Sequence, residues 1–268
     1  MASIIHDSTN NDILYPKGFG HGLVPRDYTQ YPATMFALPK DMPLIPRSEW
    51  DARIKEQEER KSSLEHIRMT GANGSMIPSL DQNGQGYCWA YSVTGTVMLC
   101  RARDNQPYVR LSAHGVACKV KGFQDEGGWC GLSAEFIRKN GVPSVEAWPE
   151  KSMARTNDNP ATWEDAKRHM ITEDWVDLAA GHIADQNLTF DQAATCLLLN
   201  IPCALDFNWW GHSVCGIRLM RVEAGSYGIK ILNSWTDTWE DNGMSTLQGQ
   251  KTIPNGGVAT SVVLASEK

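Results

Sequence analysis

The chain has 268 residues, of which 41% are hydrophobic and 21% are charged, the mixture of an ordinary globular protein. This composition excludes a wholly disordered or fibrous chain. No apolar run approaches the roughly 18 residues that a membrane-spanning helix needs, so no membrane partner is expected. The net charge of -6 disfavours nucleic acid as a partner, because a nucleic-acid surface usually needs an excess of basic residues.

Residues 1–49 differ from the rest of the chain. Six of the thirteen prolines lie here, with tyrosine and phenylalanine residues between them. Proline at this density prevents helices and central strands, whereas the aromatic side chains argue against a fully solvated tail. We therefore expect an extended arm that lies on a protein surface, either its own or a partner's. The first residues have neither a basic region nor a long apolar stretch, so no secretory signal is expected.

Residues 50–75 are predicted to form a charged helix followed by a flexible joint. From Trp50 to Arg68, acidic and basic residues alternate at spacings that allow i,i+4 ion pairs. Few apolar residues share one face, so the helix should be exposed with one thin contact face. Gly71 to Ser75 is the joint.

Residues 76–140 are predicted to form a helical lobe. The segment 88–101 is apolar almost all round, which is typical of a buried helix. Ser112 is a suitable N-cap for a second helix. Ser133 is a suitable cap for a third, which should end near Gly141.

Residues 141–268 are predicted to form a β-rich lobe. Short helices are expected between residues 160 and 200, the clearest over 190–199. Four stretches rich in valine and isoleucine then predict strands, separated by glycine turns, at 203–207, 213–220, 227–232 and 258–264. A helical half followed by a β half indicates the α+β class.

Seven cysteines are scattered along the chain, and their odd number leaves at least one thiol unpaired within it. No Cys-x-x-Cys pair occurs, and a zinc site built from Cys203, His212 and Cys215 is disfavoured, so we expect neither a metal nor another cofactor. Most of the cysteines are expected to be small buried hydrophobic residues rather than a disulfide scaffold. This usage fits the cytoplasm or another reducing compartment.

One cysteine, Cys88, follows a glycine-rich turn and stands at the start of a predicted helix. The thiolate is the reactive form of cysteine, and the partial positive charge at a helix N-terminus lowers the pKa of a thiol. A nearby imidazolium would lower the pKa further. The sequence should therefore supply a histidine for Cys88, with a third group that holds the ring.

His212 is the best candidate for that histidine, because it opens a predicted strand directly after Trp209-Trp210-Gly211. The neighbouring strand ends at Asn233. An antiparallel pairing of the two strands would bring His212 and Asn233 side by side. The amide oxygen of Asn233 could then accept from one ring N–H and fix the tautomer, leaving the other ring nitrogen for the sulfur.

Seven blocks, collinear along residues 76–268, resemble the papain-like cysteine peptidase family. They are Gln82 six positions before Cys88, Cys88-Trp89-Ala90-Tyr91-Ser92, Leu111-Ser112, Gly127-Gly128, Asn140-Gly141-Val142-Pro143-Ser144, Gly211-His212-Ser213-Val214, and Asn233-Ser234-Trp235 followed by Trp239 and Asn242-Gly243. One Cys-Trp pair would be a weak signal, whereas seven blocks in order are specific. The resemblance implies a papain-like two-lobed α+β fold, with a helical N-terminal lobe and an antiparallel β-rich C-terminal lobe, preceded here by the arm.

The resemblance also implies an activity, the hydrolysis of peptide bonds in a peptide or protein substrate. Cys88 would attack the amide carbonyl, and His212 would hold the proton and pass it to the leaving amine. Asn233 would orient His212. The Gln82 side chain and the backbone N–H of Cys88 would hold the oxyanion.

Three further residues receive binding roles from the resemblance. Gly127 and Gly128 would present their backbone to an extended peptide, as in strand addition. Trp235 would cover the hydrogen bond between His212 and Asn233 from water.

The sequence departs from the family pattern at several positions. Gln85 stands where the family has an extra cysteine, and Cys118 matches a half-cystine without a partner, so the usual disulfides are expected to be absent. Tyr87 replaces a small residue and is expected to crowd the cleft. Gly211 replaces an aspartate, and Thr236 replaces a glycine. These changes bear on substrate preference more than on the nucleophile.

Two other functions share the same fold, and fold does not fix function. One is an amidase or transferase that uses the same Cys-His-Asn set on other amides. The other is a non-enzymatic papain-like module, docked to a larger assembly by its arm. For residues 1–75 two roles stay open: a segment that occludes the cleft and is removed or displaced, or a docking arm for a larger protein assembly.

Overall fold

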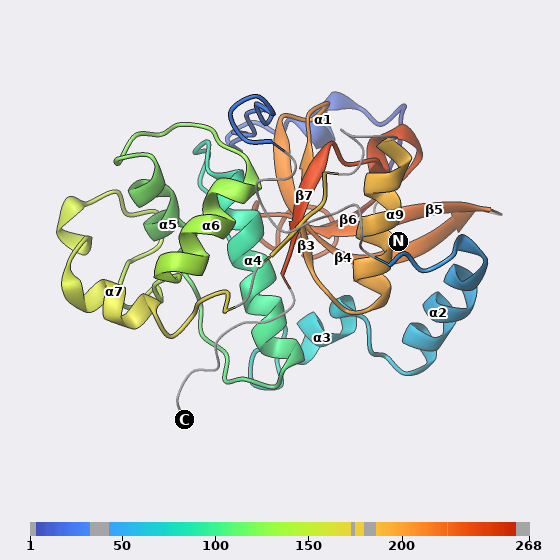
Figure 1. The fold of residues 1–268 in the computed structure, drawn as a ribbon, viewed down its shortest axis with the longest axis horizontal. Helices are drawn as coiled ribbons and strands as arrows, with labels where there is room; N and C mark the ends of the chain where they lie inside the picture. The colour runs from blue at the N-terminus through green and yellow to red at the C-terminus, as the bar shows by residue number, and fades with distance from the viewer. Residues whose placement is uncertain (1–3, 33–42, 173–174, 180–185, 224, 261–268) are drawn as a thin grey trace.

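A long buried helix, α4 (Cys88–Arg103), runs through the middle of the computed structural model, which describes residues 4–32, 43–172, 175–179, 186–223 and 225–260. Every residue of α4 from Cys88 to Arg101 is buried. The helix packs on strands of the sheet on one side and on the other helices of its own lobe on the second side (Figure 1). A helix enclosed on all sides needs apolar residues all round, as the sequence predicts.

The helical lobe is completed by α5 (Ala113–Val120), α6 (Cys130–Asn140), α7 (Pro160–Ala166) and the short 3-10 helix η1 (Arg155–Asn157). The helix α6 ends before Gly141, as expected. Gly141 has a φ of +80°, and a Cβ at this position would lie 1.9 Å from the Ala166 carbonyl oxygen, so only glycine fits.

The start of α6 differs from the prediction. The helix begins at Cys130, with Trp129 as its N-cap, so Ser133 lies within its first turn. The Ser133 hydroxyl lies 2.8 Å from the carbonyl oxygens of Trp89 and Cys130. Ser133 therefore ties α6 to α4 instead of capping a helix.

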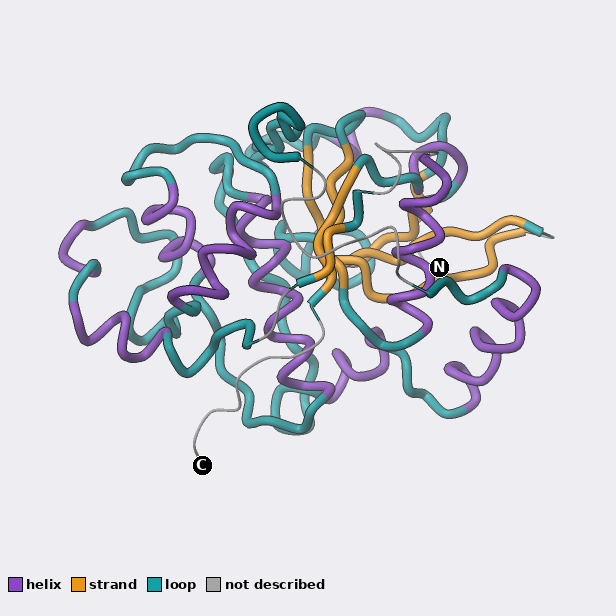
Figure 2. Tube along the Cα trace, viewed as in Figure 1, coloured by secondary structure: helices purple, strands orange, loops and turns teal. Residues whose placement is uncertain are grey.

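The second lobe is built on a seven-stranded sheet with the order β1-β6-β5-β4-β3-β7-β2. Figure 2 shows the strands, in orange, gathered beside the helices of the first lobe. The strands are β1 (Ile4–Ile5), β2 (Val176–Asp177), β3 (Cys203–Phe207), β4 (His212–Glu223), β5 (Ser226–Leu232), β6 (Met244–Leu247) and β7 (Gly256–Ala259). All pairs are antiparallel except β1 with β6. The mixture of helices and a largely antiparallel sheet confirms the α+β class.

The predicted strands at 203–207, 213–220 and 227–232 correspond to β3, β4 and β5. The fourth was placed too late, because β7 begins at Gly256, and residues 261–264 of that prediction lie outside the described residues. Strands β1, β2 and β6 were not predicted, because two to four residues are too short to show an alternating pattern. The predicted helix 190–199 is α9 (Gln186–Leu198), which packs on β3 and β4. A short 3-10 helix, η2 (Gly249–Thr252), precedes β7.

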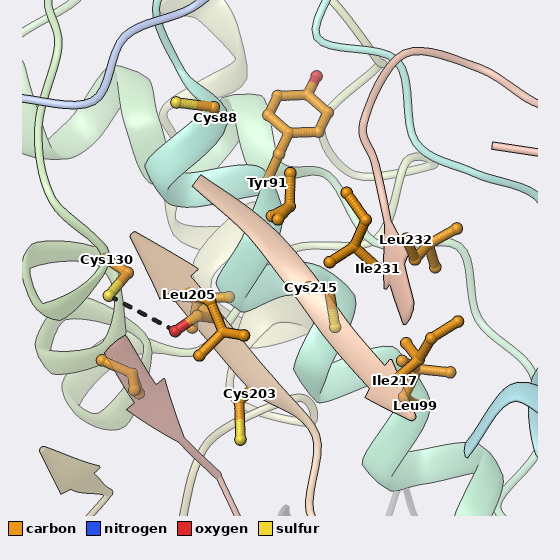
Figure 3. Packing of buried hydrophobic residues seen from close by; sticks show 14 of the residues in the cluster. Cys88, Tyr91, Leu99, Cys130, Cys203, Leu205, Cys215, Ile217, Ile231 and Leu232 are labelled. Atoms are coloured by element: carbon orange, nitrogen blue, oxygen red, sulfur yellow. Dashed lines mark hydrogen bonds between the residues drawn. The ribbon is translucent and has the colours of Figure 1, made fainter. Parts of the chain in front are cut away.

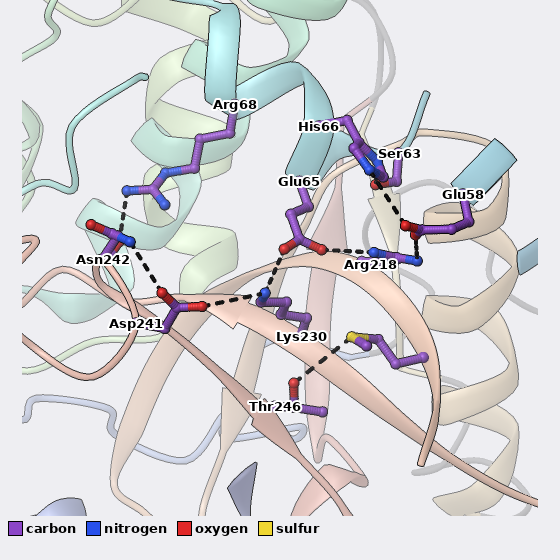
Figure 4. A network of polar contacts seen from close by, with 11 residues as sticks. Glu58, Ser63, Glu65, His66, Arg68, Arg218, Lys230, Asp241, Asn242 and Thr246 are labelled. Atoms are coloured by element: carbon purple, nitrogen blue, oxygen red, sulfur yellow. Dashed lines mark hydrogen bonds and ion pairs between the residues drawn. The ribbon is translucent and has the colours of Figure 1, made fainter. Parts of the chain in front are cut away.

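The charged segment forms two helices, α2 (Arg47–Glu59) and α3 (Leu64–Thr70), and not the single exposed helix that was predicted. Between them Lys61 has a φ of +49°, which no continuous helix allows. Polar contacts hold α3 against the sheet: its Glu65 accepts hydrogen bonds from Lys230 and Arg218 (Figure 4).

The core extends from the arm through both lobes and includes six tryptophans that are among its largest enclosed side chains. All seven cysteines are buried and unbridged. Figure 3 shows Cys88 at the start of α4, set apart from Cys203 and Cys215 on the strands. Among the described residues no helix has the length and apolar character to cross a membrane, and no group of three or more metal-binding side chains converges.

Candidate active site

Cys88 is the first residue of α4, and its side chain is completely buried. The backbone of Ser213, the residue after His212 in β4, acts on the Cys88 thiol and lowers its pKa against the larger rise caused by burial. Helix α4 packs on β4, so Cys88 at the start of α4 and His212 at the start of β4 lie on neighbouring elements.

His212 and Asn233 come together as the strand pairing predicts. His212 opens β4, Asn233 directly follows β5, and the two strands are antiparallel neighbours. The Nε2 atom of His212 lies 2.8 Å from the Oδ1 atom of Asn233. Within the described part of the chain, the other ring nitrogen, Nδ1, has no hydrogen-bond partner. An imidazole held at Nε2 and unpartnered at Nδ1 is arranged to exchange a proton at Nδ1.

Trp235 covers this pair. Its ring stacks on the imidazole of His212 with the centroids 4.6 Å apart and an interplanar angle of 28°. Trp210 contacts the imidazole by its edge, at 4.9 Å between centroids. These apolar rings keep water away from the bond between His212 and Asn233, which strengthens it.

Gln82 is buried in the turn before α4 and is fixed at both ends of its amide. The Oε1 atom accepts a 2.6 Å hydrogen bond from the Ser234 hydroxyl, which comes from the loop that carries Asn233. The Nε2 atom donates to the carbonyl oxygens of Gln85 at 2.7 Å and Gly20 at 3.0 Å. Gln82 therefore already holds a peptide carbonyl, that of Gly20 in the N-terminal arm.

The arm runs through the site as an extended backbone. The carbonyl oxygen of Gly20 accepts a second hydrogen bond, from Trp235 Nε1 at 3.1 Å. The N–H groups of Gly22 and Leu23 both donate to the Gly211 carbonyl oxygen, at 3.2 and 3.0 Å. The arm is thus bound by residues of the β-rich lobe along one side.

On its other side the arm pairs with Gly128 as an isolated parallel bridge centred on Leu23. The Gly128 N–H donates to the Gly22 carbonyl oxygen and the Val24 N–H donates to the Gly128 carbonyl oxygen, both at 2.9 Å. A Cβ on the adjacent Gly127 would lie 2.6 Å from the Gly22 carbonyl oxygen. Bare backbone at both glycines therefore lets a second chain lie against the helical lobe.

Two glycines of the arm allow it to lie this close. A Cβ at Gly20 would lie 2.3 Å from the Gln85 carbonyl oxygen, and a Cβ at Gly22 would lie 2.1 Å from the Gly86 carbonyl oxygen. Both contacts are shorter than any real Cβ contact, so larger residues would push the arm away from the turn before Cys88. The pair of glycines in a proline-rich segment is a sequence signal that could have marked this contact.

Burial under the arm keeps the thiol and the imidazole uncharged. It raises the pKa of Cys88 to about 12, and hydrogen bonds from the backbone of Ser213 and Gly22 offset only part of this rise. Burial also lowers the pKa of His212 to about 3, and the neighbouring ring of His21 lowers it further. Burial therefore opposes the formation of a thiolate–imidazolium pair.

Sequence reasoning missed a buried network behind the turn before α4. Gln85, to which no role was assigned, bonds through Oε1 to Nε2 of His114, and its Nε2 lies 2.9 Å from the Met153 sulfur. The Nδ1 atom of His114 in turn lies 2.5 Å from the Tyr91 hydroxyl. The network fixes the turn that carries Gln82, and no spacing in the sequence indicates it.

Tyr87 does not crowd the cleft as expected. Its ring is buried, and its hydroxyl donates to the Gln124 carbonyl oxygen at 2.8 Å. Gly211 has a φ of +61° in the turn between β3 and β4, a conformation that favours glycine over the aspartate of the family pattern.

Known structures share this arrangement of lobes. The chain superimposes on xylellain, a cysteine protease from Xylella fastidiosa, with a TM-score of 0.61, 16% identity and coverage of 92% of this chain and 97% of that chain. The fold is papain-like. Procathepsin L2 from the Tenebrio molitor larval midgut gives a TM-score of 0.59 at 19% identity, covering 96% of this chain and 81% of that chain. The recombinant stem bromelain precursor gives 0.56 at 16%, covering 94% and 85%. No family model and no curated protein matches the sequence, so the likeness is one of fold.

Proposed function

We propose that the chain is a cysteine peptidase whose arm blocks its own cleft. The observation that carries this proposal is a peptide backbone seated across Cys88. Gln82 and the Gly128 N–H donate hydrogen bonds to its carbonyl oxygens, and the carbonyl oxygens of Gly128 and Gly211 accept from its N–H groups, in the manner in which a substrate peptide would be held.

In the proposed reaction the Cys88 sulfur adds to the carbonyl carbon of a peptide bond while its proton passes to Nδ1 of His212. The Gln82 amide and the Cys88 N–H stabilise the oxyanion. His212 then protonates the leaving amine, and a thioester remains on Cys88. Water, deprotonated by His212, hydrolyses the thioester and restores the thiol. Asn233 keeps the ring oriented throughout.

The arm must leave before any of this occurs, because Cys88 is completely buried and the arm occupies the hydrogen-bonding groups of Gly128 and Gly211 that a substrate would use. Displacement would return water to the site, and the pKa values of thiol and imidazole would move toward each other. The same burial is the one observation that favours a second candidate function, a papain-like module that stays permanently closed. The accessibility of Cys88 separates the two.

We therefore expect iodoacetamide to modify Cys88 slowly in the wild-type chain and faster in Gly22→Ala. The increase at pH 7.5 should be at least about tenfold, since each unit of pKa changes the thiolate fraction tenfold. In the wild type, labelling should stay slow until the pH approaches the thiol pKa of about 12. Mass spectrometry of the Cys88 peptide provides the measurement.

Gly20→Ala should behave like Gly22→Ala, and Lys17→Ala, at an exposed position of the same arm, should behave like the wild type. His212→Ala in the Gly22→Ala background should slow the labelling again. Equal labelling of the wild type and both glycine variants would instead support the permanently closed module.

A further inference from the structure

A small cavity of about 40 Å³ lies beside the proposed cleft, where arm, sheet and helical lobe meet. Leu23 and Arg26 of the arm enclose it on one side. Trp129 and Asp206 of the body of the protein enclose it on the other. No part of the proposed peptide hydrolysis uses this cavity.

Arg26 is the cation that the arm places there. Its Nη1 atom donates to both carboxylate oxygens of Asp177 in β2, at 2.8 and 2.9 Å. Its guanidinium carbon lies 4.3 Å from the centre of the Trp129 ring, within the range of a cation–π interaction. The side chains of Arg26 and Asp177 are only 7% and 0% exposed, so the ion pair is buried.

A second buried carboxylate, Asp206 in β3, lines the cavity itself, whereas Asp177 is linked to the cavity through its ion pair with Arg26. Its Oδ2 atom accepts hydrogen bonds from the Cys130 N–H at 3.3 Å and from the Cys130 thiol at 3.1 Å. Its Oδ1 atom has no hydrogen-bond partner in the described part of the chain. Asp206 of β3 is paired in register with Ser213 of β4, and Ser213 directly follows His212 in the chain.

When the arm leaves, Arg26 leaves with it, and the two carboxylates lose the cation that faces them. A buried charge without a partner is costly, so the empty pocket favours a new cation over an apolar group. Trp129 belongs to the body of the protein and remains to stack on a planar cation, which favours guanidinium over ammonium. The residues that remain around the emptied pocket therefore suit an arginine side chain, like that of Arg26.

We propose that Asp177 and Asp206 select a basic side chain, arginine before lysine, of a peptide bound in the cleft. The inference rests on the proposed peptidase function for its substrate, and it identifies the two aspartates as specificity-determining residues. Peptides that present arginine close to the cleaved bond are the substrate class that this pocket fits.

Binding tests this proposal without catalysis. The full chain carrying Cys88→Ala and Gly22→Ala is titrated by calorimetry with sets of four-residue peptides. Each set varies one of the four positions, which holds arginine, lysine, norleucine or glutamate, and keeps the other three constant. We expect arginine to bind about tenfold more tightly than norleucine at one position, the scale of a charge-assisted hydrogen bond. Glutamate should bind most weakly there.

Asp177→Asn and Asp206→Asn, added separately, should each reduce the preference for arginine several-fold. Asp191→Asn should keep it, because Asp191 pairs with the exposed Arg47 away from the cleft. Thermal melting shows that each variant is folded, and Asp177→Asn suffices if Asp206→Asn does not fold. Norleucine binding as well as arginine at every position, an unchanged preference in the aspartate variants, or no binding of the arginine peptide would each overturn the proposal. Because Cys88 is absent, failure here is separate from a failure of Cys88 to react with iodoacetamide.

Discussion

At the scale of single residues, the site combines side chains that are tightly held with a few that are strained. His212 is fixed at one nitrogen by Asn233 and covered by Trp235. The next residue, Thr236, adopts a φ of +64°, a left-handed conformation that costs a β-branched residue about 1–2 kcal/mol. The family pattern has glycine at this position, so the strain is specific to this chain.

Replacing Thr236 should therefore reveal the strain. Thr236→Gly should be more stable to unfolding than Thr236→Ala by about 1 kcal/mol, because both lose the hydroxyl contacts to Thr238 and only glycine accepts the positive φ. Urea unfolding of the two variants measures the difference. An alanine variant as stable as the glycine variant would show that the backbone relaxes instead.

The residues of the proposed mechanism could be predicted from the sequence because each is tied to a local pattern. Cys88 starts a helix, and His212 and Asn233 stand at the ends of two consecutive strands rich in valine and isoleucine, for which antiparallel pairing is expected. The carboxylate of Asp206 gave no such signal, because it lies within a buried strand between apolar residues. Its importance appears only when the arm brings Arg26 from 180 positions away in the sequence.

At the scale of elements, the segment of α2 and α3 is fastened to the sheet by charge. Glu65 of α3 contacts Lys230 of β5 and Arg218 of β4 (Figure 4). Burial raises the pKa of Glu65, but the hydrogen bonds and charges of the two cations outweigh it, and the pKa is lowered from its usual 4.5. A lowered carboxyl pKa stabilises the fold above the unfolded value, and this stability is lost as the pH falls through the folded value.

Glu65→Gln should therefore cost about 2–3 kcal/mol of unfolding free energy at pH 7, below the 3–5 kcal/mol of a completely buried pair. The loss should begin to shrink as the pH falls below about 4.5, where the carboxyl of the unfolded chain becomes protonated, and should vanish as the pH falls through the lowered pKa of the folded state. Urea unfolding at several pH values measures both effects. Glu59→Gln, in an exposed pair with Lys55, is the matched control and should change stability by less than about 0.5 kcal/mol. A pH-independent cost for Glu65→Gln would contradict the assignment.

The elements that were predicted wrongly or missed from the sequence all depend on contacts or backbone conformations that residue patterns do not show. The break at Lys61 depends on a positive φ at a residue that rarely adopts one, so the charge pattern alone predicts a continuous helix. The short strand β1 forms only because it pairs with β6, which lies far along the chain. The position of the arm depends on backbone hydrogen bonds, which any residue type can make. Only Gly20 and Gly22, where a side chain would not fit, indicate this position in the sequence.

At the scale of the whole molecule, the arm connects the two lobes and is anchored at both ends. Strand β1 pairs with β6 before the arm crosses the site, and α2 packs on β4 and α9 after it (Figure 1). Between these anchors the backbone bonds to Gly211 of one lobe and Gly128 of the other. Under the proposed function, the middle of the arm would be displaced or cut while the anchors stay in place.

Hydrolysis of a mixed library of short peptides by the full chain tests the central claim most directly. We predict slow hydrolysis by the wild type and faster hydrolysis by Gly22→Ala. Adding Cys88→Ala to Gly22→Ala should lower the rate by at least about 1,000-fold, the scale found when a catalytic nucleophile is removed. Hydrolysis that survives Cys88→Ala, or no hydrolysis by Gly22→Ala and Gly20→Ala alike, would contradict the account.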